Sequence, residues 1–150
     1  MDIFSIPEVQ FFFQLLLACL LGSLIGIERE RIGKEAGMRT FALIAVGSAL
    51  FTILSREGFL GLGGSIDPSR IAAGVVMGIG FLGSGIIIFR GARIEGLTTA
   101  AALWSVGAIG MAIGAQFYTL SIIGAFIIIV VLSLMKEVKI EEKEGREGKK

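Results

Sequence analysis

A stretch of 39 residues without a charged side chain, Leu97 to Met135, most constrains how this chain can fold. At a helical rise of about 1.5 Å per residue it would extend about 58 Å, roughly twice the thickness of the hydrocarbon core of a bilayer. The stretch therefore predicts two membrane-spanning helices that fold back on each other around residues 114–119. Gly114, Gln116 and Tyr118 suit an interfacial turn at that place.

Composition places the rest of the chain in the membrane as well. Hydrophobic residues make up 54% of the sequence and glycine adds 22 of 150 residues, more apolar surface than a soluble domain of this size can bury. A formal net charge of +1 leaves no basic surface for nucleic acid. Histidine is absent, and the lone Cys19 excludes an intramolecular disulfide and a paired-cysteine metal site. We expect a membrane protein that is not an enzyme, binds no nucleic acid and needs no cofactor.

The apolar segments predict an all-α protein with five transmembrane helices. Each segment is close to the 20 or so apolar residues that a span requires, although the second is short. The predicted spans cover residues 11–27, 39–54, 71–89, 97–114 and 119–135. Together they form one transmembrane domain, residues 1–135, followed by a charged tail, residues 136–150.

The basic residues predict the orientation of these spans. If the connections alternate between the two sides, 12 of the 14 Lys and Arg residues fall on one side and two on the other. Basic residues collect in cytoplasmic connections. The sequence therefore predicts an N-terminus outside the cell and a C-terminus in the cytoplasm.

Glycine is concentrated in the third predicted span, where residues 78–83 match the GxGxxG pattern of dinucleotide-binding proteins. That fingerprint requires a preceding strand and an exposed helix N-terminus, so its position inside a span excludes the dinucleotide interpretation. A second interpretation is that residues 80–85 unwind locally and expose backbone carbonyls to a substrate or ion.

Tight helix packing is the simpler interpretation of the same glycines. At about 100° per residue, Gly74, Gly78 and Gly85 share one face of the third span, and Gly80 and Gly83 lie on the opposite face. Small residues on two faces allow neighbouring helices to approach closely, which predicts that the third span is central. Its expected partner is the fourth span, which carries its own small-residue stripe: Ala100, Gly107, Gly110 and Gly114.

Charged side chains lie only at the ends of the predicted spans. A short charged connection brings Glu28, Arg29 and Arg39 near one another, either as membrane anchors and ion pairs or as a binding site for a partner or ion. Asp67 precedes a proline, is expected to cap the third span, and could meet Arg70 one turn later.

Polar and aromatic residues also occur inside the fourth span. Thr98 and Thr99 open it, and their hydroxyls can bond to backbone or across helices. Trp104, the only tryptophan, is expected to pack within the span. The openings of the second and fourth spans, residues 37–42 and 96–101, echo each other and suggest a parallel internal repeat.

These motifs together resemble the MgtC/SapB family of prokaryotic inner-membrane proteins over roughly residues 10–135. The matching stretches are Gly26–Glu30, Gly37–Thr40, Asp67 with Arg70, Gly78–Gly85, and Gly96–Ala101 followed by Trp104. The resemblance implies multi-pass proteins linked to growth in low magnesium. It also implies partners in the membrane, either ATP synthase or magnesium transporters.

One departure concerns the segment after the last span. Longer family members carry a soluble domain there, whereas residues 136–150 of this sequence contain 11 charged residues. Such a segment cannot build a core and is expected to be disordered or a short frayed helix.

The sequence therefore favours a non-enzymatic regulator or accessory factor in magnesium homeostasis that contacts other membrane proteins and forms homo-oligomers. The alternative is a small oligomeric transporter or channel for magnesium or another small solute; whether a metal binds directly is left open. The polar candidates are Glu28, Arg29, Glu30, Arg39, Thr40, Asp67, Arg70, Thr98 and Thr99. The packing or binding candidates are Gly74, Gly78, Gly80, Phe81, Gly83, Ser84, Gly85, Trp104, Gly107 and Gly110.

Overall fold

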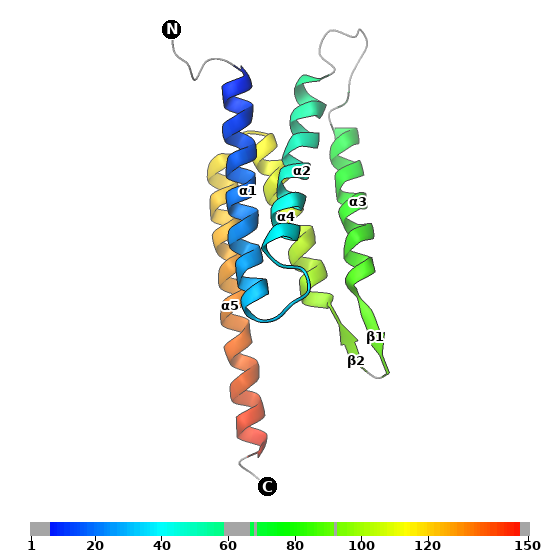
Figure 1. Cartoon of the computed structure of the whole chain (residues 1–150), viewed down its shortest axis with the longest axis vertical. Helices are drawn as coiled ribbons and strands as arrows, with labels where there is room; N and C mark the ends of the chain where they lie inside the picture. Colours follow the sequence, from blue (N-terminus) through cyan, green and yellow to red (C-terminus); the bar gives the residue numbers. More distant parts are fainter. Residues whose placement is uncertain (1–6, 59–66, 68, 92, 148–150) are drawn as a thin grey trace.

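The structure is an all-helical bundle with one short β-hairpin (Figure 1). This computed structural model describes residues 7–58, 67, 69–91 and 93–147, with side chains as far as Leu134. The elements in chain order are α1 (Pro7–Arg31), α2 (Met38–Glu57), α3 (Ser69–Ile86), β1 (Ile88–Arg90), β2 (Arg93–Glu95), α4 (Leu97–Gly114) and α5 (Tyr118–Glu147). The all-α class predicted from the sequence is confirmed.

Four of the helices, α1 to α4, are long and apolar enough to cross a membrane. α2 has 20 residues, so it is longer than the segment expected from the sequence and no longer short for a span. The apolar part of α5 with described side chains is Tyr118–Leu134. The fifth span and the orientation stay predictions.

The turn between α4 and α5 lies where the uncharged stretch predicted it. α4 ends at Gly114, and the backbone N–H of Phe117 donates to the carbonyl of Ala112 at 2.8 Å, closing the end of the helix. Gln116 takes a left-handed backbone conformation, φ 69°, which reverses the chain. α5 then begins at Tyr118.

The third helix differs from its predicted bounds at its C-terminal end. The sequence predicted a span to Phe89, but α3 ends at Ile86 and Phe89 belongs to β1. Gly91, with φ 60°, forms the turn that follows, and a run of β-branched and aromatic residues before a glycine favours a hairpin over continued helix. The local unwinding considered for residues 80–85 is also wrong, because α3 is continuous through them.

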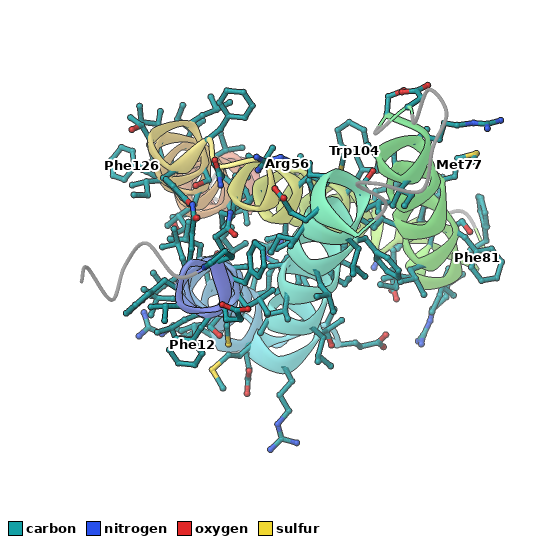
Figure 2. All side chains as sticks on the ribbon, turned by 90° about the horizontal axis from the view of Figure 1, so that it is seen from above. Phe12, Arg56, Met77, Phe81, Trp104 and Phe126 are labelled. Atoms are coloured by element: carbon teal, nitrogen blue, oxygen red, sulfur yellow. The ribbon has the colours of Figure 1, made fainter. Side chains whose placement is uncertain are left out.

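The prediction that the third helix is central is wrong. α4 lies at the centre, packed against α1, α2, α3 and α5, while α3 lies at one side of the bundle (Figures 1 and 2). Of the residues of α3, only Ile79 and Gly83 are buried. The core is formed instead between α1, α2 and α4, with Ile25, Phe41 and Leu103 fully buried. Helical periodicity identified the faces of α3 but not which neighbour covers them.

Glycines do allow close packing, but chiefly against α2. A Cβ added at Gly22 of α1 would lie 2.7 Å from the carbonyl oxygen of Phe41, and one at Gly114 of α4 would lie 2.6 Å from that of Ala49. One at Gly110 would run into the carbonyl oxygen of Ala45. The small-residue stripe of α4 is therefore shared: Ala100 and Gly107 face α3 as predicted, whereas Gly110 and Gly114 face α2.

α5 does not stop at the end of its apolar segment. The sequence suggested disorder or a short frayed helix after Met135, whereas the structure continues α5 as one helix to Glu147. The added residues are mostly lysine and glutamate, which have high helix propensity and can extend a helix that packing has already nucleated.

Candidate functional site

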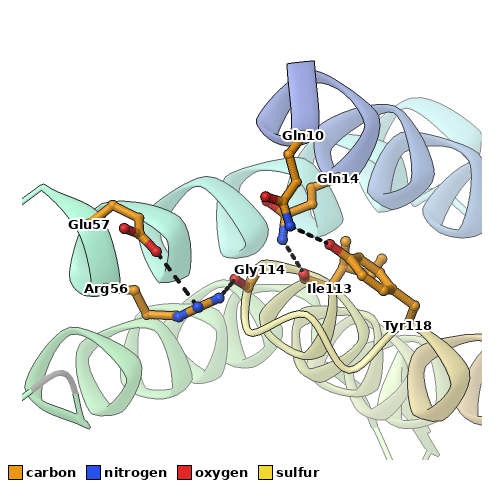
Figure 3. A network of polar contacts seen from close by, with 7 residues as sticks. All are labelled: Gln10, Gln14, Arg56, Glu57, Ile113, Gly114 and Tyr118. Carbon is orange, nitrogen blue, oxygen red and sulfur yellow. Dashed lines mark hydrogen bonds and ion pairs between the residues drawn. The ribbon is translucent and has the colours of Figure 1, made fainter. Parts of the chain in front are cut away.

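A network of polar contacts links four helices at the end of the bundle where α4 meets α5 (Figure 3). The amide nitrogen of Gln14 donates to the carbonyl of Ile113 at 2.9 Å, and Arg56 Nη1 donates to the carbonyl of Gly114 at 3.0 Å. Both carbonyls lie in the last turn of α4, where the regular helical bonding pattern ends, and that of Ile113 also accepts the backbone N–H of Gln116 at 2.9 Å. Side chains of α1 and α2 therefore complete the end of α4.

Gln14 is the residue of this network that sequence reasoning missed. It is 2% exposed, and its side-chain oxygen has no hydrogen-bond partner among the described residues. Nearby, the amide of Gln10 reaches the hydroxyl of Tyr118 at 3.5 Å. The available signal was a glutamine pair four residues apart, on one face of an otherwise apolar span.

The opposite end of the bundle carries the predicted charged residues, and the structure brings some of them together. Arg29 Nε lies 2.6 Å from Glu28 Oε2, and the Arg29 side chain is only 3% exposed. Glu30 Oε2 accepts the backbone N–H of Met38 at 3.1 Å, which caps the first turn of α2. Gly37 is small enough to let that carboxylate approach, since an added Cβ would lie 2.7 Å from it.

Other members of the predicted polar set lie apart from this cluster. Arg39 and Thr40 are exposed, and no ion pair within the described part of the chain includes Arg39. Thr98 is exposed and Thr99 is buried, both in the first turn of α4. Of the expected group of Glu28, Arg29 and Arg39, only Glu28 and Arg29 form an ion pair among the described residues.

Asp67 acts locally, as the sequence predicted for a helix cap. Its Oδ1 accepts hydrogen bonds from the hydroxyl of Ser69 at 2.6 Å and from the backbone N–H of Ser69 at 2.9 Å. These bonds, the hydroxyl first, hold the pKa of the Asp67 carboxyl below its ordinary value, with the positive charge of Arg70 a smaller cause. Asp67 and Arg70 form no ion pair among the described residues.

Two glycines of α3, Gly74 and Gly78, border a groove instead of a packed interface. The groove has a volume of about 710 Å³ and is lined only by residues of α2 and α3, including Gly47, Gly74 and Gly78. A Cβ added at any of these three glycines would meet nothing within 4 Å. Phe81 and Met77, both more than 70% exposed, point away from the bundle beside it (Figure 2).

Of the remaining packing candidates, some lie in the contact between α3 and α4 and others are exposed. Gly83 faces Ala100 of α4, and Ile79 fills the space left by Gly107. Gly80, Ser84 and Gly85 are exposed. Trp104, expected to pack within the span, is half exposed and borders a smaller apolar hollow between α3 and α4.

Metal-ligating side chains are sparse in this arrangement. Among the residues with described positions, no three His, Cys, Asp or Glu side chains lie close enough together to hold a metal ion. What the described residues offer is a polar network at one end, a charged cluster at the other, and an open apolar groove along α3.

Comparison with known proteins places this architecture in a family. The sequence profile of the MgtC family matches residues 15–140. "Putative magnesium transporter YhiD" of Escherichia coli (strain K12) is 46% identical over 132 residues, which cover 85% of this chain and 61% of that protein. "Protein SrpB" of Synechococcus elongatus is 42% identical over 137 residues, covering 85% of this chain and 75% of that protein.

A third relative extends further beyond the matched region. "Protein MgtC" of Brucella abortus (strain 2308) is 43% identical over 119 residues, covering 79% of this chain and 48% of that protein. The chain thus spans about half to three quarters of the length of these relatives. No solved structure matches it. The match over most of the chain, and the identity to SrpB over three quarters of that protein, show that the chain belongs to the MgtC family.

Proposed function

We propose that this protein is a non-enzymatic membrane regulator or accessory factor in magnesium homeostasis that acts by helix contact with another membrane protein. Its setting would be the prokaryotic inner membrane. Membership of the MgtC family and the similarity to YhiD, which is named a putative magnesium transporter, support the link to magnesium. The candidate partners are ATP synthase or a magnesium transporter, as the family resemblance implies.

The uncovered glycine face of α3 is the observation that carries this proposal. Helices in lipid gain little from burying apolar side chains, so they associate through small residues that let backbones come close. Gly22 of α1 and Gly110 and Gly114 of α4 are covered by α2, whereas Gly74 and Gly78 of α3 border an open groove. A helix of a partner protein would find there the same kind of surface that α2 finds on α4.

The groove also suits a helix in its composition. Apart from Ser48, its lining consists of apolar residues and glycines. The Ser48 side chain is 3% exposed, so the surface offered to a partner is almost wholly apolar. This favours a membrane-spanning segment over a charged or water-soluble partner.

A pull-down from native membranes at low magnesium tests the proposal. Gly78→Leu would fill the groove, while the matched control Gly80→Leu adds the same side chain to the other face of α3, where it also meets nothing within 4 Å. We expect an ATP synthase subunit or a magnesium transporter to be captured by the wild type and Gly80→Leu, and at least tenfold less by Gly78→Leu. Equal capture by all three, or capture of this chain alone, would contradict the proposal.

The second candidate is a small oligomeric transporter or channel for magnesium or another small solute. The name of YhiD is the observation that favours it. In this interpretation the α3 face would join copies of the chain around a pathway. Purified protein in liposomes loaded with a magnesium-sensitive dye distinguishes the regulator from the transporter. Magnesium flux above that of protein-free liposomes supports the transporter, and no such flux excludes it.

We further propose five spans with the C-terminus in the cytoplasm. The 12-to-2 division of basic residues supports this orientation, and so does the uncharged segment Tyr118–Leu134 of α5. An alkaline phosphatase reporter fused after residue 150 should be inactive, because the enzyme requires an oxidising compartment. The same reporter fused at the α4–α5 turn should be active, and the reverse pattern would refute the orientation.

A further inference from the structure

The hairpin between α3 and α4 exposes side chains that no other described part of the chain covers. Its strands pair antiparallel with Ile88 opposite Glu95, Phe89 opposite Ile94 and Arg90 opposite Arg93. All six residues are exposed. Two strands of three residues each are too few to be stable alone in water, so an additional surface is expected to support them.

The two faces of the hairpin differ in character. Side chains alternate along a strand, and directly paired residues share a face. Phe89 and Ile94 therefore form an apolar face, with 73% and 50% of their surfaces exposed. The opposite face carries the charged residues of the hairpin.

The charged face places two arginines directly opposite each other. Like charges in such a pair repel, and only one of them is compensated: Arg90 Nε lies 3.4 Å from Glu95 Oε2. Arg93 has no ion pair within the described part of the chain. An anion would relieve the repulsion, and a guanidinium group can bind a phosphate through two parallel hydrogen bonds.

The flanking helices limit how far the hairpin can extend from the bilayer. It directly joins α3 and α4, both long enough to cross a membrane, and projects from their ends (Figure 1). Three residues at about 3.3 Å each reach roughly 10 Å. The two headgroup layers together add about 10–15 Å to the hydrocarbon core, about 5–8 Å on each side, so a hairpin at the end of two spans lies largely within one of these layers.

We propose that the hairpin is an interfacial anchor for anionic lipid. Phe89 and Ile94 insert at the boundary between headgroups and acyl chains, and Arg90 and Arg93 bind headgroup phosphate. The occupant is lipid because the hairpin directly joins two helices that are long and apolar enough to cross a membrane, while the facing arginines complement a negatively charged headgroup. This anchor is independent of the partner proposed above for the α3 groove.

Fluorescence of the full chain in lipid nanodiscs tests the anchor. Trp104 is the only tryptophan, so Phe89→Trp in a Trp104→Phe background reports on the hairpin alone. We expect quenching by lipids brominated close to the headgroup, at least twofold stronger with brominated phosphatidylglycerol than with brominated phosphatidylcholine. Combined Arg90→Gln and Arg93→Gln should abolish that preference while the bromolipid quenching itself remains.

The same measurement contains the results that would overturn the proposal. Quenching by aqueous iodide without quenching by bromolipid would place the apolar face in water. Protection from both quenchers would indicate cover by protein, such as a second copy of this chain. A preference for phosphatidylglycerol that survives both arginine substitutions would exclude phosphate binding by these side chains. An unchanged thermal unfolding midpoint of the reporter variant verifies that it is folded.

Discussion

Glycines occur in two contrasting settings in this bundle. On α1 and α4 they face α2 so closely that a methyl group at Gly22, Gly110 or Gly114 would collide with a carbonyl oxygen of α2. On α3, Gly74 and Gly78 are four residues apart, as Gly110 and Gly114 are on α4. Nothing described lies within 4 Å of the position that a methyl group would take at either of the α3 glycines. Glycine thus allows close packing of α1 and α4 on α2, and on α3 it borders a groove that no described helix fills.

The contrast teaches that glycine spacing in a span identifies a surface for close approach but not its occupant. In α4 the occupant is α2, and the interface forms part of the buried core. On α3, a Cβ at Gly74 or Gly78 would meet no helix within 4 Å in the part of the chain that the structure describes. The energetic role of these residues should therefore differ sharply between the two regions, and substitution can measure that difference.

The largest effect is expected from Gly110→Leu. The added side chain would have to displace the backbone of α2 at Ala45 and the side chain of Ser48, and a backbone cannot yield as a flexible side chain can. We expect a loss of about 3 kcal/mol in the free energy of unfolding, the upper end of the range for overpacked cores. Unfolding in mixed micelles with increasing denaturing detergent measures it.

Gly78→Leu is the matched comparison on α3. The same four carbon atoms enter the groove, and leucine is a better helix former than glycine by somewhat less than 1 kcal/mol. The variant should be as stable as the wild type or slightly more stable in the purified chain. If both substitutions destabilise the protein equally, the distinction between covered and open glycines is wrong.

The helices themselves could largely be predicted, because hydropathy depends only on composition along the chain. α4 begins and ends at the predicted residues 97 and 114, and the turn before Tyr118 follows from the length of the uncharged stretch. Gly37 and Gly96 also immediately precede α2 and α4, as the two similar openings suggested.

The neighbours of each helix could not be predicted. Which helix contacts a given face depends on distant parts of the chain, so α3 was wrongly placed at the centre. Gln14 was missed for the same reason, since the carbonyl it reaches lies 99 residues away. The hairpin had a local signal, Gly91 after a run of β-branched and aromatic residues. It was missed because the third span was predicted from the length of the apolar segment alone.

Two ion pairs allow a similar comparison between a buried and an exposed position, with a smaller expected effect on the free energy of unfolding. Glu28→Gln would leave the guanidinium of Arg29, 3% exposed, without its carboxylate at 2.6 Å. Loss of one partner from a buried pair costs about 3 kcal/mol, and the adjacent water at the helix end should reduce this to about 2 kcal/mol. Glu95→Gln, in the exposed pair beyond α3, should change the free energy of unfolding by less than about 1 kcal/mol. Equal losses in the same detergent titration would contradict the difference in burial.

The smallest effect concerns the cap of α3, which depends on local bonds because few tertiary contacts hold this helix. Hydrogen bonds from Ser69 lower the pKa of Asp67 in the folded protein below the ordinary value of 3.8. Folding therefore favours the ionised carboxylate, so its stabilisation is fully present above pH 3.8 and is lost as the pH falls through the lower, folded pKa.

Asp67→Asn separates this titration from those of the other carboxyl groups, because asparagine keeps an oxygen that can cap the helix but carries no charge. The difference in thermal midpoint between wild type and Asp67→Asn should be constant above about pH 5 and should shrink towards pH 2, since the wild-type carboxyl becomes neutral there. Hydrogen exchange at Ser69 and Arg70 should show the same trend locally. A difference that grows on acidification would mean that the folded state raises the pKa, and the assigned bonds from Ser69 would then be wrong.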